Sequence, residues 1–115
     1  MASRIADPLL TVVIPVYNEV DTIEEIIGRV LAVPLRIELI VVDDGSTDGT
    51  RDTIARLQQS LAFKYLPQPV NMGKGAAVRR GFGEMTVDIA VIQDADLEYS
   101  PEEYPQLIDL ICQGK

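Results

Sequence analysis

The stretch Val41-Val42-Asp43-Asp44-Gly45-Ser46 is the strongest indicator of the fold, because an apolar run passes directly into two carboxylates and a turn. A short run rich in Val and Ile is typical of a parallel strand that is buried on both faces. A second stretch, Val91-Ile92-Gln93-Asp94-Ala95-Asp96, repeats this arrangement later in the chain. Open α/β sheets place their ligand sites at the carboxyl ends of such strands. We therefore expect both acidic stretches to lie at one rim of a parallel sheet.

Outward from these stretches, apolar strands alternate with amphipathic helices four times. The alternation predicts an α/β fold, namely a doubly wound, mostly parallel Rossmann-like sheet of four β-α units with helices on both faces. The 115 residues suffice for one domain with one core. The expected strands cover residues 9–15, 37–43, 63–66 and 87–93, and the helices that follow them begin near residues 21, 49, 76 and 101.

Two of the helices begin with sequences that are typical of capping. Asp21-Thr22-Ile23-Glu24 offers a side-chain acceptor at the helix start and Glu three residues later. Ser100-Pro101-Glu102-Glu103 combines Ser at the cap, Pro at the first helical position and Glu at the third. We expect side-chain hydrogen bonds to close both helix ends.

Composition excludes several classes of protein. The net charge of −8 argues against a nucleic-acid binder, which would present a basic face. The absence of His removes Ser-His-Asp triads and His-based zinc sites. The single thiol, Cys112, fits a reduced, cytoplasmic compartment and is expected to be buried and inert. No leader-like apolar segment opens the chain, and no apolar run approaches the ~20 residues of a membrane-spanning helix.

Asp94 and Asp96 are the candidate metal ligands. Residues two apart in an extended chain point to the same face, so both carboxylates can reach one ion. Carboxylates without His suit a hard divalent cation, Mg²⁺ or Mn²⁺. The alternative is a solvated acidic strand end. The negative balance of the chain favours the metal, because an anionic diphosphate at this rim requires a cation.

Three further segments could contact a nucleotide. In Asp43-Asp44-Gly45-Ser46 a carboxylate could accept from a base, although a plain turn uses the same residues. Tyr17 could pack on a base and Glu19 or Asn18 could bind ribose or base, although strand-end chemistry explains these residues too. The loop at residues 71–75 carries Lys74 and could close on a phosphate, but it lacks the Walker pattern. Arg79-Arg80 favours a solvated helix face.

In order along the chain, these motifs resemble those of family-2 glycosyltransferases of the glycosyltransferase-A fold, and in particular the enzymes that make dolichyl- or polyprenyl-phosphate sugars. The resemblance covers nearly the whole chain. It is carried by residues 13–19, 41–50, 71–79 and 93–97, together with the helix that begins at Pro101. By this resemblance Pro15, Tyr17, Glu19 and Asp44 bind the nucleoside, Lys74 lies near the base or phosphates, Asp94 lies near the ribose or diphosphate, and Asp96 is the direct metal ligand.

The resemblance implies a hexosyltransferase-type enzyme that moves a sugar, with inversion, from a GDP- or UDP-linked donor. A polyprenyl phosphate is the expected acceptor, which would bring the protein to the cytoplasmic face of a membrane. Residues 1–115 correspond to the nucleotide-sugar-binding half of such a domain, so the catalytic base is expected beyond residue 115. The missing half would leave the fourth strand exposed, and self-association through that edge is expected.

Two other classes remain as alternatives. The chain could be a nucleotide-binding module without catalysis. It could also be a signalling receiver domain, but that class carries its acidic pair after the first strand, where this chain has Tyr17-Asn18-Glu19. A dinucleotide oxidoreductase does not fit, because Val78 stands where the third Gly of the fingerprint belongs.

Overall fold

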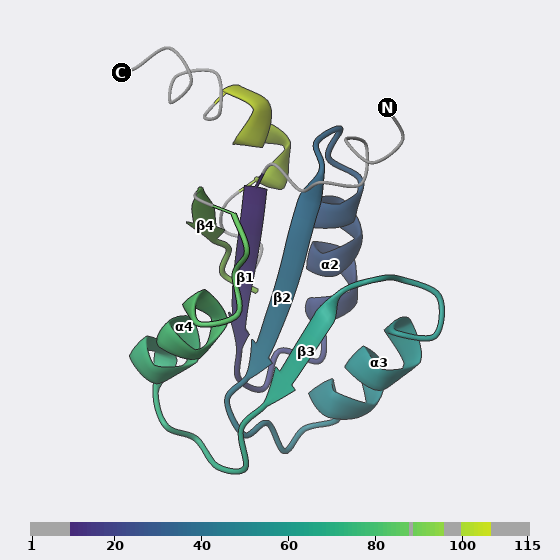
Figure 1. The fold of residues 1–115 in the computed structure, drawn as a ribbon. Helices are drawn as coiled ribbons and strands as arrows, with labels where there is room; N and C mark the ends of the chain where they lie inside the picture. The colour runs from purple at the N-terminus through teal and green to yellow at the C-terminus, as the bar shows by residue number, and fades with distance from the viewer. Residues whose placement is uncertain (1–9, 88, 96–99, 107–115) are drawn as a thin grey trace.

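The computed structural model describes residues 10–87, 89–95 and 100–106, and within them a single parallel sheet forms the centre of the protein (Figure 1). The strand order is β3-β2-β1-β4, and every pairing is parallel. The predicted α/β fold is therefore confirmed. The strands are β1 (Leu10–Val16), β2 (Ile37–Asp43), β3 (Lys64–Pro67) and β4 (Ala90–Ile92), and the helices are α2 (Ile23–Leu31), α3 (Thr50–Leu57), α4 (Lys74–Phe82) and the short 3-10 helix η1 (Pro101–Glu103).

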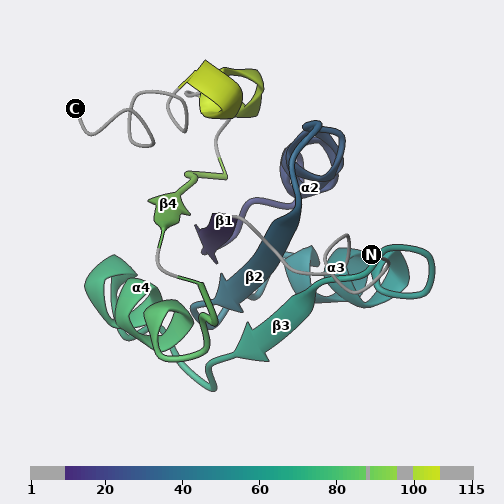
Figure 2. The same ribbon diagram turned by 45° about the horizontal axis from the view of Figure 1, so that its top comes forward.

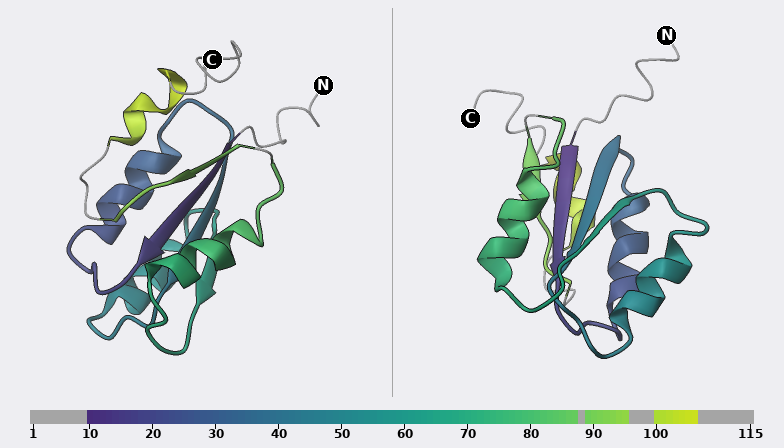
Figure 3. Two further views of the ribbon diagram at one scale, coloured as in Figure 1. Left: turned by 90° about the vertical axis from the view of Figure 1, so that its left-hand side faces the viewer. Right: turned by 60° about the horizontal axis from the view of Figure 1, so that its bottom comes forward.

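Helices cover both faces of the sheet, with α2 and α3 on one side and α4 on the other (Figures 2 and 3). Successive side chains of β1 point to opposite faces of the sheet, so this strand contributes to a core on each face. Val12 and Ile14 belong to the larger core with α2 and α3, whereas Val13 belongs to the smaller core beneath α4. All three side chains are fully buried. Each such side chain contributes about 1.5–3 kcal/mol through burial, which explains why the central strands are apolar on both faces.

Most element bounds differ from the prediction by one or two residues, and the differences in α4 and β4 affect the rim of the sheet. Helix α4 begins at Lys74 rather than near residue 76, because Gly73 turns the chain with a φ of 97°. Strand β4 is shorter than predicted, although hydrogen bonds to β1 continue on either side of it, from Thr11 N to Ile89 O and from Gln93 N to Val13 O, each 2.9 Å long.

Both predicted capping hydrogen bonds are absent at the described helix starts, so those predictions were wrong. Thr22 rather than Asp21 occupies the cap position of α2, and Ser100 occupies that of η1, but neither side chain caps its helix. Pro101 does take the first position, and the helix there opens as a 3-10 turn. The Thr22 hydroxyl instead donates to the Ala95 carbonyl, 2.5 Å away, and so joins the start of α2 to the segment after β4.

Glu38 fastens the chain between α4 and β4 to the amino end of the sheet. Its carboxylate accepts from the Thr86 backbone N–H at 2.9 Å, the Thr86 hydroxyl at 3.0 Å and the Thr11 hydroxyl at 2.7 Å. Burial by itself would raise the pKa of Glu38, but these hydrogen bonds, with a smaller contribution from Lys64, hold it below its ordinary value. The Glu38 carboxylate therefore joins the start of β2 to β1 and to the chain between α4 and β4.

We predict that Glu38→Gln lowers the free energy of unfolding by about 1 kcal/mol at neutral pH, because charged acceptors bind donors more strongly than neutral ones. A lowered folded-state pKa stabilises the fold above the unfolded value, about 4.3, and this stability is lost as pH falls through the folded value. Urea unfolding at several pH values should show the difference shrinking below about pH 4. A difference that stays constant down to pH 3, or that matches the exposed control Glu103→Gln, would refute this role.

Candidate functional site

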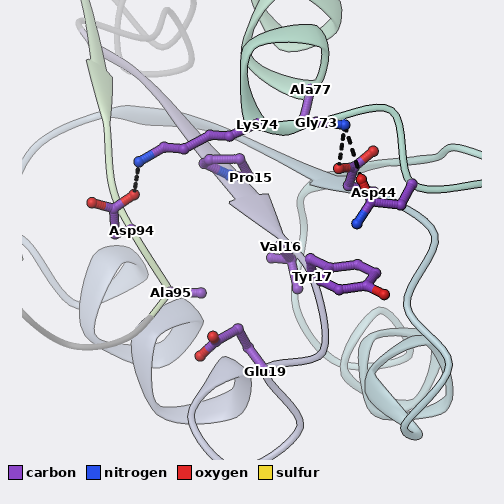
Figure 4. Close-up of a pocket in the computed structure, with 11 residues that line it drawn as sticks. Pro15, Val16, Tyr17, Glu19, Asp44, Gly73, Lys74, Ala77, Asp94 and Ala95 are labelled. Atoms are coloured by element: carbon purple, nitrogen blue, oxygen red, sulfur yellow. Dashed lines mark hydrogen bonds and ion pairs between the residues drawn. The ribbon is translucent and has the colours of Figure 1, made fainter.

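A pocket of 430 Å³ opens at the carboxyl ends of β1, β2 and β4 (Figure 4). Its volume lies within the usual range for small-molecule sites. All six residues predicted to contact a nucleotide line it, which brings together side chains from four separate segments. The lining residues are Pro15, Val16, Tyr17, Glu19, Asp44, Asn71, Gly73, Lys74, Ala77, Asp94 and Ala95.

Asp44 does not extend freely over the rim. It is 4% exposed, and its carboxylate accepts from the backbone N–H groups of Met72 at 2.7 Å and Gly73 at 2.9 Å. The Gln68 side-chain amide donates to it as well, at 3.1 Å. Asp44 therefore holds the loop that leads into α4. Any contact between Asp44 and a ligand would be additional to these structural hydrogen bonds.

Asp43, the neighbouring carboxylate, was not assigned a role from the sequence. It is fully buried and accepts from Arg51 Nε at 2.7 Å, the Tyr65 hydroxyl at 3.0 Å and the Ser46 backbone N–H at 2.9 Å. Burial and the bond to Asp43 raise the pKa of Tyr65, so its hydroxyl stays a donor. Arg51 also donates to the Gln68 carbonyl. The two carboxylates therefore have different structural roles. Asp43 joins β2, β3 and α3, whereas Asp44 holds the loop before α4.

The small polar residues after β2 form hydrogen bonds with the turn that follows β1. The Ser46 hydroxyl accepts from Asn18 N at 2.9 Å, and the Thr50 hydroxyl accepts from Glu19 N at 3.0 Å. In return the Asn18 side chain accepts from Thr47 N at 2.8 Å, and Asn18 itself has a φ of 54°. These bonds fix the turn after β1 and so orient Tyr17 and Glu19 at the pocket.

Lys74 and Asp94 meet across the pocket. The Lys74 ammonium lies 2.5 Å from Asp94 Oδ1, although the residues belong to α4 and to the segment after β4 (Figure 4). The side chains are 60% and 27% exposed. A pair that is open to water to this extent contributes less than about 1 kcal/mol to stability. The position of this ion pair matters more than its contribution to stability, because it puts a positive and a negative group on facing walls of one cavity.

The donor set at this rim suits a divalent cation. Asp94 and Glu19 present carboxylates to the pocket, and oxygen ligands are those that Mg²⁺ and Mn²⁺ prefer. No cluster of three acidic, His or Cys side chains occurs among the described residues. This still fits, because such ions are commonly held by one or two carboxylates and completed by phosphate oxygens and water.

The predicted alignment of Asp94 with Asp96 rests on an extended chain between the two residues. The chain leaves β4 before Asp94 and turns at Ala95, which is buried. The Thr22 hydroxyl fixes this turn through the Ala95 carbonyl. Asp96 lies outside the described residues, as does Cys112. The metal-binding role of Asp94 and Asp96 stays a prediction.

Two solved structures that contain nucleotides share this fold. A mannosyltransferase from Pyrobaculum calidifontis, in complex with GDP-Man and Mn²⁺, is 31% identical with a TM-score of 0.75 over 84% of this chain and 30% of that chain. Glucosyl-3-phosphoglycerate synthase from Mycobacterium tuberculosis, in complex with Mn²⁺ and UDP-glucose, is 30% identical with a TM-score of 0.75 over 98% and 42%. The fold and the pocket thus define an α/β protein of the glycosyltransferase-A type.

The chain belongs to glycosyltransferase family 2, since the family model described as "Glycosyl transferase family 2" matches residues 11–115. A dolichol-phosphate mannosyltransferase of Pyrococcus furiosus is 37% identical over 107 residues, which is 91% of this chain and 30% of that protein. An undecaprenyl-phosphate 4-deoxy-4-formamido-L-arabinose transferase of Aeromonas hydrophila is 38% identical over 114 residues, or 92% and 34%. The chain spans about a third of the length of these curated relatives.

Over the part of the chain that is described, none of the helices has the length and apolar character needed to cross a membrane.

Gly45 is required where the loop crosses the end of β2. Its φ is +83°, and a Cβ placed there would lie 2.6 Å from both the Asn71 backbone nitrogen and the Val70 carbonyl carbon. We predict that Gly45→Ala destabilises the protein by about 2–4 kcal/mol, because it adds backbone strain to a steric overlap. Thermal or urea unfolding measures the change.

Gly28→Ala is the matched control. Gly28 lies within α2, and a Cβ there would meet nothing within 4 Å. This variant should gain roughly 0.5–1 kcal/mol from the higher helix propensity of Ala. Equal effects of the two substitutions, or a Gly45→Ala variant as stable as the parent, would show that the loop does not depend on this close approach.

Proposed function

We propose that residues 1–115 form the nucleotide-sugar-binding half of a metal-dependent glycosyltransferase that transfers a hexose-type sugar from a GDP- or UDP-linked donor. The observation that carries this proposal is the pocket at the carboxyl rim, where all six predicted nucleotide-contacting side chains converge. Family membership and the donors named in the two solved structures support it.

The diphosphate is proposed to lie between α4 and the segment after β4. The amino end of α4 reaches this side of the pocket through Gly73 and Lys74. The helix dipole favours an anion at such an end, and the Lys74 ammonium adds positive charge there. Asp94 and Glu19 would repel that anion, so a divalent cation, Mg²⁺ or Mn²⁺, is needed between them. Two structural relatives carry Mn²⁺ with their nucleotides, which supports this arrangement.

The nucleoside is proposed to occupy the other side, beneath β1 and β2. Tyr17 is 45% exposed and borders the pocket, so its ring offers a face on which a base can stack. Pro15 supplies an apolar wall there. Asp44 and Asn71 also border this region. Because the Asp44 carboxylate is already occupied by loop N–H groups, we propose that it shapes the base site as well as reading the base.

In the reaction these residues would bind and orient the donor. Lys74 would hold a phosphate oxygen, and Tyr17 would hold the base, so that the sugar extends from the rim. A divalent cation near Asp94 would neutralise charge that develops on the leaving diphosphate. We propose inversion at the anomeric carbon and a polyprenyl phosphate acceptor, since two relatives are named for dolichol and undecaprenyl phosphates. An ionised phosphate acceptor needs no strong base.

We predict that Asp94→Asn weakens binding of UDP and GDP in the presence of Mn²⁺ by about ten- to a hundred-fold, the size of one lost charge-assisted contact. Isothermal titration calorimetry measures this, and EDTA should weaken the unmodified protein similarly. Asp52→Asn is the matched control, because Asp52 is an exposed carboxylate in α3 that does not line the pocket.

Equal nucleotide affinity with Mn²⁺ and with EDTA would remove the metal from the proposal. Binding by Asp94→Asn that matches Asp52→Asn would remove Asp94. Transfer of sugar from GDP-mannose or UDP-glucose to a polyprenyl phosphate then separates an enzyme from a module that binds nucleotide without catalysis.

We also propose self-association through β4, together with a peripheral place at the cytoplasmic membrane face where a polyprenyl phosphate would be met. β4 ends the order of the described sheet, and Ile92 is 43% exposed on it. An uncovered apolar edge favours pairing with another chain. Ile92→Lys should shift sedimentation toward monomer without loss of nucleotide binding. A parent protein that is monomeric at high concentration would contradict the self-association.

A further inference from the structure

The ion pair between Lys74 and Asp94 is placed where two binding partners are proposed to enter. Lys74 lies on the α4 wall, where a phosphate would sit, and Asp94 lies on the opposite wall, where a cation would sit (Figure 4). Their 2.5 Å contact spans the space between these walls. Neither the phosphate nor the cation can take its place without altering this contact.

We propose that Lys74 is an internal substitute for the metal ion, and that metal and nucleoside diphosphate displace this pair together. This inference rests on the proposed function. With the pocket empty, the Lys74 ammonium neutralises Asp94 and removes one source of repulsion from an acidic rim. When the diphosphate binds, Lys74 turns to a phosphate oxygen and leaves Asp94 to the cation. The total charge at the rim stays balanced before and after binding.

The exchange makes the binding of the two ligands mutually dependent. A metal ion alone has to break the contact between Lys74 and Asp94, and a diphosphate alone leaves Asp94 facing an anion. When the metal ion and the diphosphate both bind, the free-energy cost of breaking the ion pair arises only once for the two ligands. Such a shared cost raises the affinity of each ligand for the complex with the other by the same factor. Direct contact between metal and phosphate adds to this coupling but does not involve Lys74.

The position of Lys74 is built into the fold. Asp44 holds the backbone N–H of Gly73, the residue before Lys74, at 2.9 Å. On the other wall, Thr22 holds the carbonyl of Ala95, the residue after Asp94, at 2.5 Å. The backbone next to each member of the pair is thus held, while the side chains of Lys74 and Asp94 remain partly exposed. Fixed backbones with exposed side chains allow an exchange of partners without a rearrangement of the fold.

The test is Lys74→Gln, compared with Lys74→Arg and Arg80→Gln. Arg80 is exposed on the same helix and does not line the pocket, so its substitution removes one positive charge elsewhere. Binding of Mn²⁺ alone is followed by electron paramagnetic resonance of the free ion, and binding of UDP and GDP by calorimetry with and without Mn²⁺. Circular dichroism confirms that each variant is folded.

Lys74→Gln should bind Mn²⁺ alone about two- to fivefold more tightly than the parent and Arg80→Gln, as expected for the loss of a solvent-exposed competing cation. The factor by which Mn²⁺ raises nucleotide affinity should fall by a similar amount. Lys74→Arg should behave like the parent.

Mn²⁺ affinity in Lys74→Gln that equals or falls below that of Arg80→Gln overturns the exchange, even if Mn²⁺ and nucleotide still bind together. A parent protein that binds neither Mn²⁺ nor nucleotide overturns the proposed function itself, and the exchange with it. The two failures are therefore distinguishable.

Discussion

The adjacent carboxylates of Asp43 and Asp44 hold together the segments from which the rim is built. Asp43 is buried against Arg51 and Tyr65, so it joins the end of β2 to α3 and β3. Asp44 receives the backbone N–H groups of the loop before α4. Because a buried carboxylate without donors would be strongly destabilising, these loops have one favoured arrangement around it. The pocket follows from that arrangement, since the loop that Asp44 holds leads directly to Lys74.

The opposite ends of the sheet have different tasks. At the amino end, Glu38 binds Thr11 and Thr86 and sets the chain between α4 and β4. At the carboxyl end, the buried Asp44 carboxylate holds backbone N–H groups, while the side chains of Tyr17, Lys74 and Asp94 at the pocket remain partly exposed. This difference between the two ends of the sheet explains how an acidic protein can bind the proposed anionic ligand. Carboxylates that serve structure are saturated by donors, and Asp94 meets a cation of the chain itself, Lys74.

Much of this could be predicted from the sequence, and the failures have physical causes. The apolar runs before Asp43 and Asp94 located β2 and β4, because buried parallel strands leave a strong pattern. Six of the residues that line the pocket could be predicted because the motifs of the family follow the strand ends. The groups that donate hydrogen bonds to Asp43 and Asp44 could not be predicted, since Arg51 and Met72 reach these carboxylates only through tertiary contacts. Asp21 was predicted to cap α2, but Thr22 takes the cap position and its hydroxyl donates to the Ala95 carbonyl, a contact that the sequence does not reveal.

The most direct test of the account is where a paramagnetic ion binds. In nuclear magnetic resonance spectra of the ¹⁵N-labelled protein, a small amount of Mn²⁺ added with UDP or GDP broadens amide signals close to the ion. The account predicts that the signals of Gly73, Lys74 and Asp94 broaden first, while those of Glu38 and Thr86 at the opposite end stay sharp. Broadening centred on Glu38, or spread evenly over the acidic surface, would contradict a metal and nucleotide site at the carboxyl rim.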